Sequence, residues 1–249
     1  MAATVVIPAR YGSTRFPAKI LASETGKPLV QHVVEQARKC RRVREVIVAT
    51  DDRRIVDVLA SLGTRTVMTL ASHPSGTDRI AEVARSLTDS IIVNVQGDEP
   101  EIEPEVIDAL VEQLENSAHD MATAATPFPP EADVADPNLV KVVVAPDGRA
   151  IYFSRAPIPF HRDSSAVTNA AYYLHLGIYA YRREFLLQYA AWPPTPVELT
   201  EKLEQLRALE HGRSIFVVRV TRATHGIDTA AQYGEFVRRY KGSRQSAAG

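Results

Sequence analysis

Cysteine is almost absent from this chain: Cys40 is the only one in 249 residues. A single thiol excludes an internal disulfide and a cysteine-rich metal site, and such cysteine usage is typical of a reducing compartment. No apolar run approaches the roughly 20 residues that a membrane-spanning helix needs. The opening residues MAATVVIPAR lack the basic segment and long apolar core of a signal peptide. We therefore expect a cytoplasmic protein with no membrane partner.

An excess of charge of one sign is also missing. The chain has 29 lysine and arginine residues against 30 aspartate and glutamate residues, for a formal net charge of -1. Nucleic-acid-binding domains usually carry a strongly basic face, so we expect no nucleic-acid partner. The length and the 45% hydrophobic content suit one globular domain. We predict a single domain over 1–249, with a smaller lobe inserted at roughly 130–195 and a disordered tail at 242–249.

The first half of the chain alternates apolar runs with helical periodicity. Continuous apolar runs predict strands buried on both faces at 4–9, 45–50 and 90–95, and 65–70 predicts a further strand between them. Between the runs, Pro28 and Pro104 suit first helical positions, and Thr77 or Asp78 suits an N-cap. This alternation predicts an α/β fold, a mostly parallel sheet with right-handed crossovers and helices on both faces.

The second half is richer in β-structure. The segment 139–154 contains two β-rich runs around a Pro-Asp-Gly turn and predicts a hairpin, and 172–181 predicts another strand. The segment 199–212 has the pattern of one amphipathic helix that ends at a glycine. A strand at 214–220 and a last helix, capped at Asp228 or Thr229, follow.

A basic loop follows the first predicted strand, in the segment IPARYGSTRFPAK (7–19). Ligands of open parallel sheets bind beyond the carboxyl ends of the strands, where this loop lies. It matches neither the dinucleotide-binding nor the Walker A glycine pattern. Backbone N–H groups around Ser13, with the cations Arg10, Arg15 and Lys19, nevertheless suit phosphate oxygens. The alternative is a solvated loop whose cations pair with nearby acids.

Acidic residues follow the fourth predicted strand, in QGDEP (96–100). Mg²⁺ in phosphate-binding sites takes one or two carboxylates plus substrate phosphates, so Asp98 is a candidate ligand. The alternative is that Asp98 or Glu99 caps the next helix. Asp228, in GIDT, is a candidate second ligand, but an aspartate before a helix is also a common N-cap.

The segment SGTDR (75–79) precedes a predicted helix and contains Ser75, Gly76 and Arg79. It suits a plain helix-capping turn, with Arg79 on the first helical turn. It equally suits one wall of a base-binding site at the carboxyl edge of the sheet. The pattern of residues leaves both interpretations open.

Seven segments occur in one order and together closely resemble the 3-deoxy-manno-octulosonate (KDO) cytidylyltransferase family, also called CMP-KDO synthetases. The resemblance extends from about Val5 to Tyr240, and the segments are IPARYGSTRFPAK, SGTDRIAE, VNVQGDEP, YFSRAPIP, HLGIYAYR, TEKLEQLRALEHG and GIDT. The chain departs from the family at Ala18 and Ile20. There the family more usually has glycine and proline, and the difference bears on loop closure.

The resemblance implies a nucleotidyltransferase that joins CTP and KDO to form CMP-KDO and pyrophosphate with Mg²⁺, for lipopolysaccharide synthesis. It also implies a Rossmann-like nucleotidyltransferase fold with a smaller, β-rich dimerisation lobe, and a homodimer. The implied catalytic residues are Arg10, Lys19 and Asp98, with Asp98 and Asp228 as metal ligands.

The resemblance also implies binding residues, at the positions of this chain that match the family's segments. For the nucleotide they are Arg10, Ser13, Arg15, Lys19, Ser75, Arg79 and Gln96. For KDO they are Gln96, Arg155, His175, Tyr179, Glu204 and Gln205. The sugar-side residues also have structural interpretations. Arg155 suits a structural ion pair, His175 a hydrogen-bonded core histidine, and Glu204 and Gln205 a solvated helix face.

Two rival functions share several of these features. A CMP-sialic acid synthetase, or another sugar nucleotidyltransferase of similar fold, would share the CTP loop and the metal. The sugar segment between residues 155 and 205 favours KDO over that alternative. A non-catalytic nucleotide-sugar sensor would be expected to lack the metal carboxylates or the loop cations, whereas this chain keeps Lys19 and Asp98.

Overall fold

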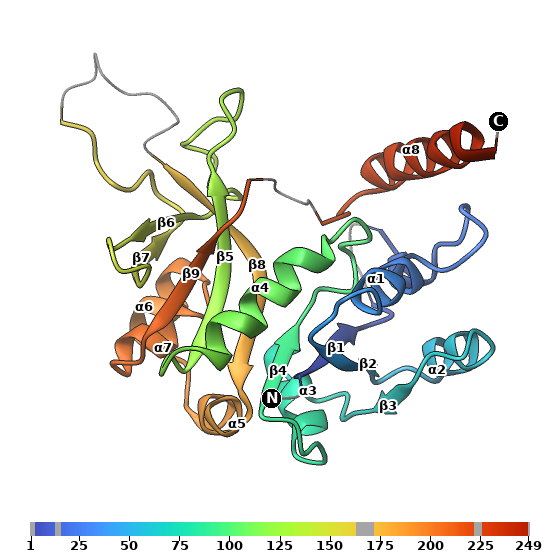
Figure 1. The fold of residues 1–249 in the computed structure, drawn as a ribbon, viewed down its shortest axis with the longest axis horizontal. Coiled ribbons are helices and arrows are strands. Elements are labelled where there is room, and N and C mark those ends of the chain that lie inside the picture. Colours follow the sequence, from blue (N-terminus) through green and yellow to red (C-terminus); the bar gives the residue numbers. More distant parts are fainter. Residues whose placement is uncertain (1–2, 13–15, 163–171, 222–225, 249) are drawn as a thin grey trace. The chain divides into compact units, whose positions relative to one another are not determined.

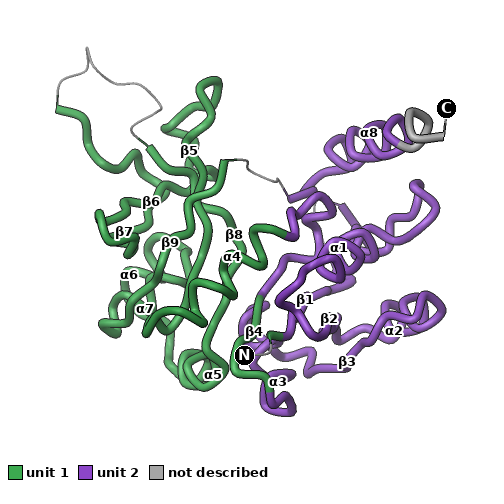
Figure 2. Tube along the Cα trace, viewed as in Figure 1, with its two compact units in different colours: residues 1–3, 89–93, 105–223 green, residues 4–88, 94–104, 224–249 purple. Residues whose placement is uncertain are grey.

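The computed structural model describes residues 3–12, 16–162, 172–221 and 226–248, with side chains described up to residue 243. It confirms the α/β fold, whose strands and helices are drawn in Figure 1. The chain forms two compact units (Figure 2). Unit 1 comprises 1–3, 89–93 and 105–223, and unit 2 comprises 4–88, 94–104 and 224–249. Both units are therefore assembled from stretches that are distant in the sequence.

Unit 2 is built around three strands in the order β3-β2-β1. These are β1 (Ala3–Ala9), β2 (Val43–Thr50) and β3 (Thr66–Met68). The pair of β2 and β3 is parallel, with Val48 opposite Thr66. The helices of the unit are η1 (Lys19–Leu21), α1 (Leu29–Ala37), α2 (Arg53–Ala60), α3 (Gly76–Ala84) and α8 (Ala230–Ala248). Val5, Val6 and Ile7 are fully buried, as the continuous apolar run predicted.

Unit 1 contains the strand order β4-β8-β5-β9. Its strands are β5 (Met121–Pro127), β6 (Lys141–Val144), β7 (Ala150–Ser154), β8 (Tyr173–Arg182) and β9 (Ile215–Arg219), with β4 (Ile91–Asn94) contributing residues to both units. β5 pairs antiparallel with β8 and parallel with β9, and β6 and β7 form the predicted hairpin. The helices are α4 (Pro104–Glu115), α5 (Arg183–Ala191), α6 (Pro196–Glu201) and α7 (Leu206–Glu210).

At the starts of α3 and α8, the structure shows which residues form the N-cap. Ser75, rather than Thr77 or Asp78, caps α3, because its hydroxyl accepts from the Asp78 N–H at 3.2 Å. At the start of α8, Thr229 and Gln232 form a reciprocal cap. The Gln232 N–H donates to Thr229 Oγ1 at 3.2 Å, and the Thr229 N–H donates to Gln232 Oε1 at 3.0 Å. The carboxylate of Asp228 is therefore not needed as the cap.

The prediction of one helix over 199–212 is wrong, because two short helices occupy this segment. α6 ends at Lys202, whose φ of 54° lies in the left-handed region and stops the helix. α7 then begins at Leu206. A lysine in this conformation carries no sequence signal comparable to a glycine, so the pattern of apolar residues alone shows no break.

The C-terminal helix α8 docks within unit 2 through a small aromatic cluster. Ile227, Tyr233 and Phe236 pack with Leu29 of α1, and the Tyr233 hydroxyl accepts from the Glu24 N–H at 3.0 Å. The backbone of α8 is helical as far as Ala248. Disorder of the tail at 242–249 stays a prediction. The predicted lobe at 130–195 lies inside unit 1, and its role as a separate lobe also stays a prediction.

Candidate functional site

A pocket of about 320 Å³ in unit 2 brings together the segments that the sheet topology placed at one edge. The end of β1, the turn before α3 and the segment after β4 line it. The lining residues are Pro8, Ala9, Arg10, His73, Pro74, Ser75, Gly76, Arg79 and Gln96. Four predicted nucleotide-side residues, Arg10, Ser75, Arg79 and Gln96, therefore share one pocket. The predicted residues Ser13 and Arg15 lie outside the described part of the chain.

Arg79 is held from behind by two side chains. It is buried, and its guanidinium donates to Asp51 Oδ2 at 3.0 Å and to Thr69 Oγ1 at 2.5 Å. Such charge-assisted bonds fix the plane of a guanidinium and leave its remaining N–H groups with a defined direction. Both interpretations of SGTDR are therefore compatible with the structure, because Ser75 caps α3 while Arg79 lines the pocket.

The sequence interpretation gave no role to His73 or Asp51. His73 lines the pocket, and its Nε2 is hydrogen-bonded to Glu82, which also accepts from the Leu70 N–H at 3.0 Å. Asp51 directly follows β2, at the carboxyl end where polar residues reach the ligand crevice of a parallel sheet. The position of Asp51 after a buried strand was the signal that could have identified it.

Lys19 lies between the two predicted metal carboxylates. Its Nζ is 2.7 Å from Asp98 Oδ2 and 3.4 Å from Asp228 Oδ1, and Lys19 itself is buried. The backbone joins the same segments, because the Ile227 N–H donates to Asp98 O at 2.9 Å. Asp98 does not act as a helix cap, because α4 begins only at Pro104. Its carboxylate faces a cation contributed by the opening loop.

The position of Lys19 depends on Ala18. Ala18 has φ of 55° and ψ of 21°, a left-handed conformation that precedes η1. L-residues rarely adopt this conformation, because Cβ crowds the backbone. The loop thus adopts, with alanine, a conformation for which glycine is suited. This accounts for one of the two departures from the family pattern.

The other departure, Ile20, packs into a tight site under the turn after β4. An added Cβ at Gly97 would lie 3.1 Å from Pro8 O and 3.2 Å from Ile20 Cδ1. Ile20 is buried there, so its side chain fills space beside a glycine whose Cβ position is crowded. Gly97 links Gln96 of the pocket to Asp98 of the carboxylate pair.

Glu99 differs electrostatically from its neighbour Asp98. Burial, and then the charge of Asp98, raise the pKa of Glu99 to about 8. At neutral pH Glu99 is therefore mostly protonated and uncharged. Of these two adjacent acids, Asp98 is the one suited to bind a cation.

The carboxylate pair fits a magnesium ion in its donor chemistry. Asp98 and Asp228 present hard oxygen donors that converge on one ammonium group, as they would on a cation. Within the described ranges, no three acidic, histidine or cysteine side chains group as a metal site. Two carboxylates with substrate phosphates completing the shell are the arrangement usual for Mg²⁺.

Two predicted sugar-side residues contact each other within unit 1. The rings of His175 and Tyr179 lie with their centroids 5.5 Å apart on β8. Burial lowers the pKa of His175 to about 3, so its imidazole is neutral. Burial, with Tyr181 and Glu204, raises the pKa of Tyr179 well above its usual value, so its hydroxyl keeps its proton.

Among the described residues, backbone carbonyls rather than a carboxylate side chain hold the guanidinium of Arg155. Its guanidinium donates to Glu201 O at 2.7 Å, Pro137 O at 2.7 Å and Lys202 O at 3.2 Å. The buried Lys141 donates to the backbone O of Arg155 at 2.5 Å. Arg155 therefore ties together the segments around β7 and α6 through carbonyl oxygens, and not through the ion pair that the sequence offered as the alternative.

Glu204 and Gln205 form the turn into α7. Gln205 is buried, so the alternative of a helix face turned to water is wrong for this residue. Its amide Nε2 is buried and finds no hydrogen-bond partner among the residues that the structure describes. An unpaired buried donor is costly, which makes Gln205 a candidate for pairing with a ligand.

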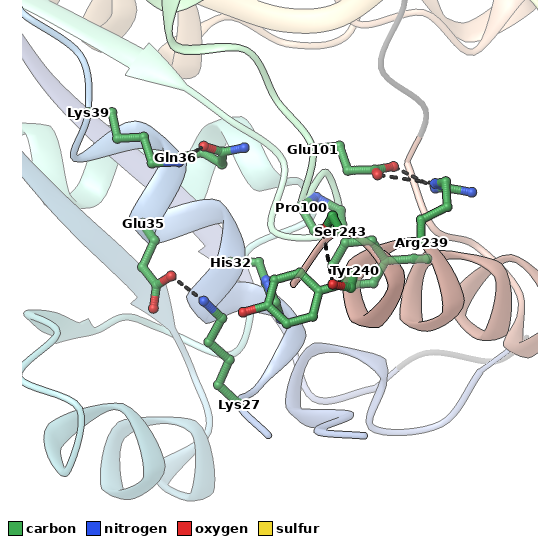
Figure 3. A pocket seen from close by; sticks show the side chains of 11 residues that line it. Lys27, His32, Glu35, Gln36, Lys39, Pro100, Glu101, Arg239, Tyr240 and Ser243 are labelled. Atoms are coloured by element: carbon green, nitrogen blue, oxygen red, sulfur yellow. Dashed lines mark hydrogen bonds and ion pairs between the residues drawn. The ribbon is translucent and has the colours of Figure 1, made fainter. Parts of the chain in front are cut away.

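A second pocket, of about 420 Å³, lies in unit 2 among α1, the segment at Pro100 and α8 (Figure 3). Its cations are paired within it. Lys27 pairs with Glu35, Arg239 with Glu101 at 2.6 Å, and Lys39 donates to Gln36 at 2.6 Å. None of the predicted site residues lines this pocket. Lys27 and Arg239 are thus neutralised by acids of the pocket, whereas Lys39 contacts an uncharged amide.

Comparison with known proteins identifies the family. Residues 4–215 match the family model described as cytidylyltransferase. The 3-deoxy-manno-octulosonate cytidylyltransferase of Geobacter sulfurreducens is 50% identical over 235 residues, covering 91% of this chain and 94% of the relative. That of Solibacter usitatus is 48% identical, covering 96% and 94%.

Solved structures agree with the sequence relatives. The structure of a CMP:2-keto-3-deoxy-manno-octonic acid synthetase complexed with CTP is 40% identical and superposes with a TM-score of 0.92, over 98% of this chain and 100% of that one. A 4-diphosphocytidyl-2C-methyl-D-erythritol synthase from Anaerococcus prevotii, 14% identical with a TM-score of 0.61, shares the fold. Within the described residues, no helix is long and apolar enough to cross a membrane. This chain belongs to the 3-deoxy-manno-octulosonate cytidylyltransferase family.

Proposed function

We propose that this chain transfers CMP from CTP to the anomeric hydroxyl of KDO, releasing pyrophosphate and forming CMP-KDO for lipopolysaccharide synthesis. The observation that carries the proposal is the convergence of Lys19, Asp98 and Asp228 in a member of this family. A cation and two carboxylates brought together from distant segments suit a polyphosphate substrate. The relative solved with CTP supports the choice of nucleotide.

The chain's own cations orient and neutralise the triphosphate. The sugar hydroxyl loses its proton to solvent as it attacks the α-phosphorus of CTP, the new O–P bond forms and the bond to pyrophosphate breaks. Such transfers are catalysed chiefly by positioning and by stabilising charge on the phosphate oxygens. Arg10 in the pocket and Lys19 beside Asp98 are placed for this role, and Lys19 stabilises the charge that develops on pyrophosphate.

Asp98 and Asp228 are the residues that would hold Mg²⁺ in this proposal. When bound, Mg²⁺ supplies positive charge to the phosphate oxygens and lowers the pKa of a hydroxyl group that it binds. Lys19 contacts the carboxylates of both residues and holds Asp98 and Asp228 together. The turn beginning at Gly97 and the reciprocal cap at Thr229 hold the two carboxylates in place.

Contacts to the sugar are assigned by family position and stay proposals. They comprise Gln96, Arg155, His175, Tyr179, Glu204 and Gln205. The unpaired amide of Gln205 and the protonated hydroxyl of Tyr179 are hydrogen-bond donors suited to a hydroxyl-rich acid. The homodimer, the cytoplasmic location and Ser13 and Arg15 as phosphate ligands also stay predictions.

A sugar-panel assay tests the reaction. Pyrophosphate release is measured with CTP, Mg²⁺ and either KDO, its 8-amino analogue or N-acetylneuraminate. We expect turnover with a KDO-type sugar, whereas turnover with N-acetylneuraminate alone would establish a CMP-sialic acid synthetase instead. A non-catalytic sensor would bind CTP without turnover in the wild type. Asp98→Asn is expected to keep CTP binding and lose turnover.

A further inference from the structure

Strand β8 contains a β-bulge at its contact with β5. Thr123 lies opposite Tyr179, but the next residue, Ala124, lies opposite Leu176. Two residues of β8, Gly177 and Ile178, are therefore inserted relative to β5. Bulges re-aim the side chains on either side of them and often lie next to functional sites.

The bulge is what brings the rings of His175 and Tyr179 together. Residues four apart in a regular strand lie about 13 Å apart, too far for ring contact. Across the bulge, His175 is opposite Ala125 and Tyr179 is opposite Thr123. Those two β5 residues are only about 7 Å apart along their strand and share a face. The observed distance of 5.5 Å between the ring centroids follows from this register.

The hydroxyl of Thr123 lies inside the bulge and contacts three groups of β8. Its Oγ1 is 2.7 Å from Ile178 O, 3.2 Å from Leu176 O and 3.0 Å from His175 Nε2. Thr123 is fully buried, so these contacts are protected from water. Carbonyl oxygens only accept hydrogen bonds, and a hydroxyl has one hydrogen to donate.

The count of hydrogens determines the direction of the histidine contact. If the Thr123 hydroxyl proton were directed at His175, the lone pairs of Thr123 Oγ1 and Ile178 O would face each other across 2.7 Å. The proton therefore goes to the carbonyls, and His175 Nε2–H donates to Oγ1. Because burial keeps the ring neutral, the other nitrogen, Nδ1, carries no hydrogen and is an acceptor.

We propose that Thr123 is a positioning residue, which holds the β8 bulge and fixes His175 as an Nε2–H tautomer whose Nδ1 accepts a hydrogen bond from a hydroxyl of the sugar substrate. An unprotonated ring nitrogen accepts a hydrogen bond from a hydroxyl and repels a carboxylate. His175 therefore binds a hydroxyl group of the sugar rather than its acid group. The sugar contact rests on the proposed function. The tautomer and the bulge do not.

NMR on the free protein tests the tautomer. A two-bond ¹⁵N–¹H correlation spectrum distinguishes protonated from bare ring nitrogens, and His175→Gln assigns the signals. We expect Nε2 protonated and Nδ1 bare in the wild type and in Thr123→Ser, which keeps the hydroxyl. In Thr123→Val we expect loss of the single tautomer. A wild-type ring protonated on Nδ1 would overturn the proposal, even if no variant folds.

Steady-state kinetics test the positioning role. Thr123→Val is expected to raise the KM for KDO about tenfold, with the KM for CTP changed by less than about twofold. Thr123→Ser is expected to restore both values. Thr126→Val, a buried threonine of the same strand on its opposite face, is the matched control. Equal changes in both KM values, or an unchanged KM for KDO despite an altered tautomer, would overturn the role.

The two proposals fail in different measurements. If the wild type releases no pyrophosphate with CTP and KDO, the proposed function fails, while the tautomer spectrum still reports on Thr123 and His175. If the wild type turns over KDO but its His175 is protonated on Nδ1, the function stands and the inference about Thr123 fails.

Discussion

Nζ of Lys19 lies 2.7 Å from Oδ2 of Asp98 although the two residues are 79 positions apart in the sequence. The ammonium is buried, and it also lies 3.4 Å from Asp228. Two carboxylates brought close together repel each other unless a cation lies between them. Lys19 therefore has two functions in our account: it holds the acidic pair together, and it provides positive charge where phosphate oxygens would bind.

Replacing Lys19 tests both functions. Lys19→Met keeps most of the side-chain volume and removes the charge, so we expect the rate of pyrophosphate release to fall on the order of 10²-fold. Lys39→Met removes a lysine that is exposed and bonded to Gln36, and it is expected to retain full activity. Wild-type turnover by Lys19→Met would show that this cation is not part of the machinery.

Asp228→Asn tests the assignment of the second metal ligand. Loss of one carboxylate is expected to raise the Mg²⁺ concentration for half-maximal activity by roughly tenfold or more. Chelation of Mg²⁺ is expected to abolish turnover in every variant, reversibly. The control Asp57→Asn changes an exposed acid of α2 that pairs with Arg53. An unchanged Mg²⁺ requirement in Asp228→Asn would remove Asp228 from the proposed metal site.

Ala18→Gly is expected to stabilise the protein. The left-handed conformation costs an L-residue about 1–2 kcal/mol, and glycine removes this cost. Glycine in turn makes the unfolded chain more flexible, which lowers the stability by about 0.5–1 kcal/mol. The net gain of about 0.5–1 kcal/mol corresponds to a rise in Tm of about 1–4 °C. Ala22→Gly, at φ of -57°, is expected to lower Tm. Equal shifts in both variants would show that strain at Ala18 is negligible.

Unit 1 contains a buried ion pair whose disruption should be costly. Arg207 donates to both carboxylate oxygens of Glu198, at 2.7 and 2.5 Å, and each side chain is 8% exposed. Burial alone favours the neutral acid, but the bonds from Arg207 outweigh it and hold the pKa of Glu198 below its usual value.

Arg207→Met is therefore expected to lower the free energy of unfolding by about 3–5 kcal/mol in urea titrations, because an unpaired carboxylate stays buried. Arg53→Met, in an exposed pair on α2, is expected to change it by less than about 1 kcal/mol. Adding Glu198→Gln to Arg207→Met should restore part of the loss. A double variant no more stable than Arg207→Met would argue against the ion-pair explanation.

His32 should make stability depend on pH in the acidic range. Burial, and then the charge of Lys27, lower the pKa of His32 from 6.5 to about 4 (its pocket is shown in Figure 3). Between these two values the unfolded chain binds the proton and the folded protein does not. The contribution is therefore complete above pH 6.5 and is lost as the pH falls towards 4.

Urea titrations between pH 4 and 7 measure this contribution. His32→Gln is expected to show a shallower loss of stability on acidification than the wild type. His211→Gln, at an exposed histidine stacked on Trp192, should follow the wild-type curve. Parallel curves for the wild type and His32→Gln would contradict the lowered pKa.

The sequence predicted most strands and the edge of the sheet where the nucleotide-side residues gather. Continuous apolar runs have few structural interpretations in an alternating chain, and parallel strands direct their following loops to one edge. Asp98 could therefore be located from its position after a strand. The role of Asp228 could not be decided, because only the structure shows that Thr229 and Gln232 supply the cap.

The sequence did not predict features that depend on single backbone torsions or on the register of paired strands. Lys202 in the left-handed region divides 199–212 into two helices without a glycine to indicate it. The β8 bulge inserts two residues, an even number, so the alternation of side chains between faces is unchanged and no irregularity appears in the pattern. Thr123 could not be linked to His175 without the register of β5 and β8.

The assembly of unit 2 from three separate stretches has a consequence for biosynthesis. Asp228 is 209 residues beyond Lys19 and reaches it only through the final stretch of the chain. A ribosome must therefore add 209 residues after Lys19 before its ammonium can meet the second carboxylate. Truncated products from premature stop codons before Asp228 would carry the basic loop without a complete acidic pair. The centre proposed for catalysis thus forms only after Asp228 has been synthesised.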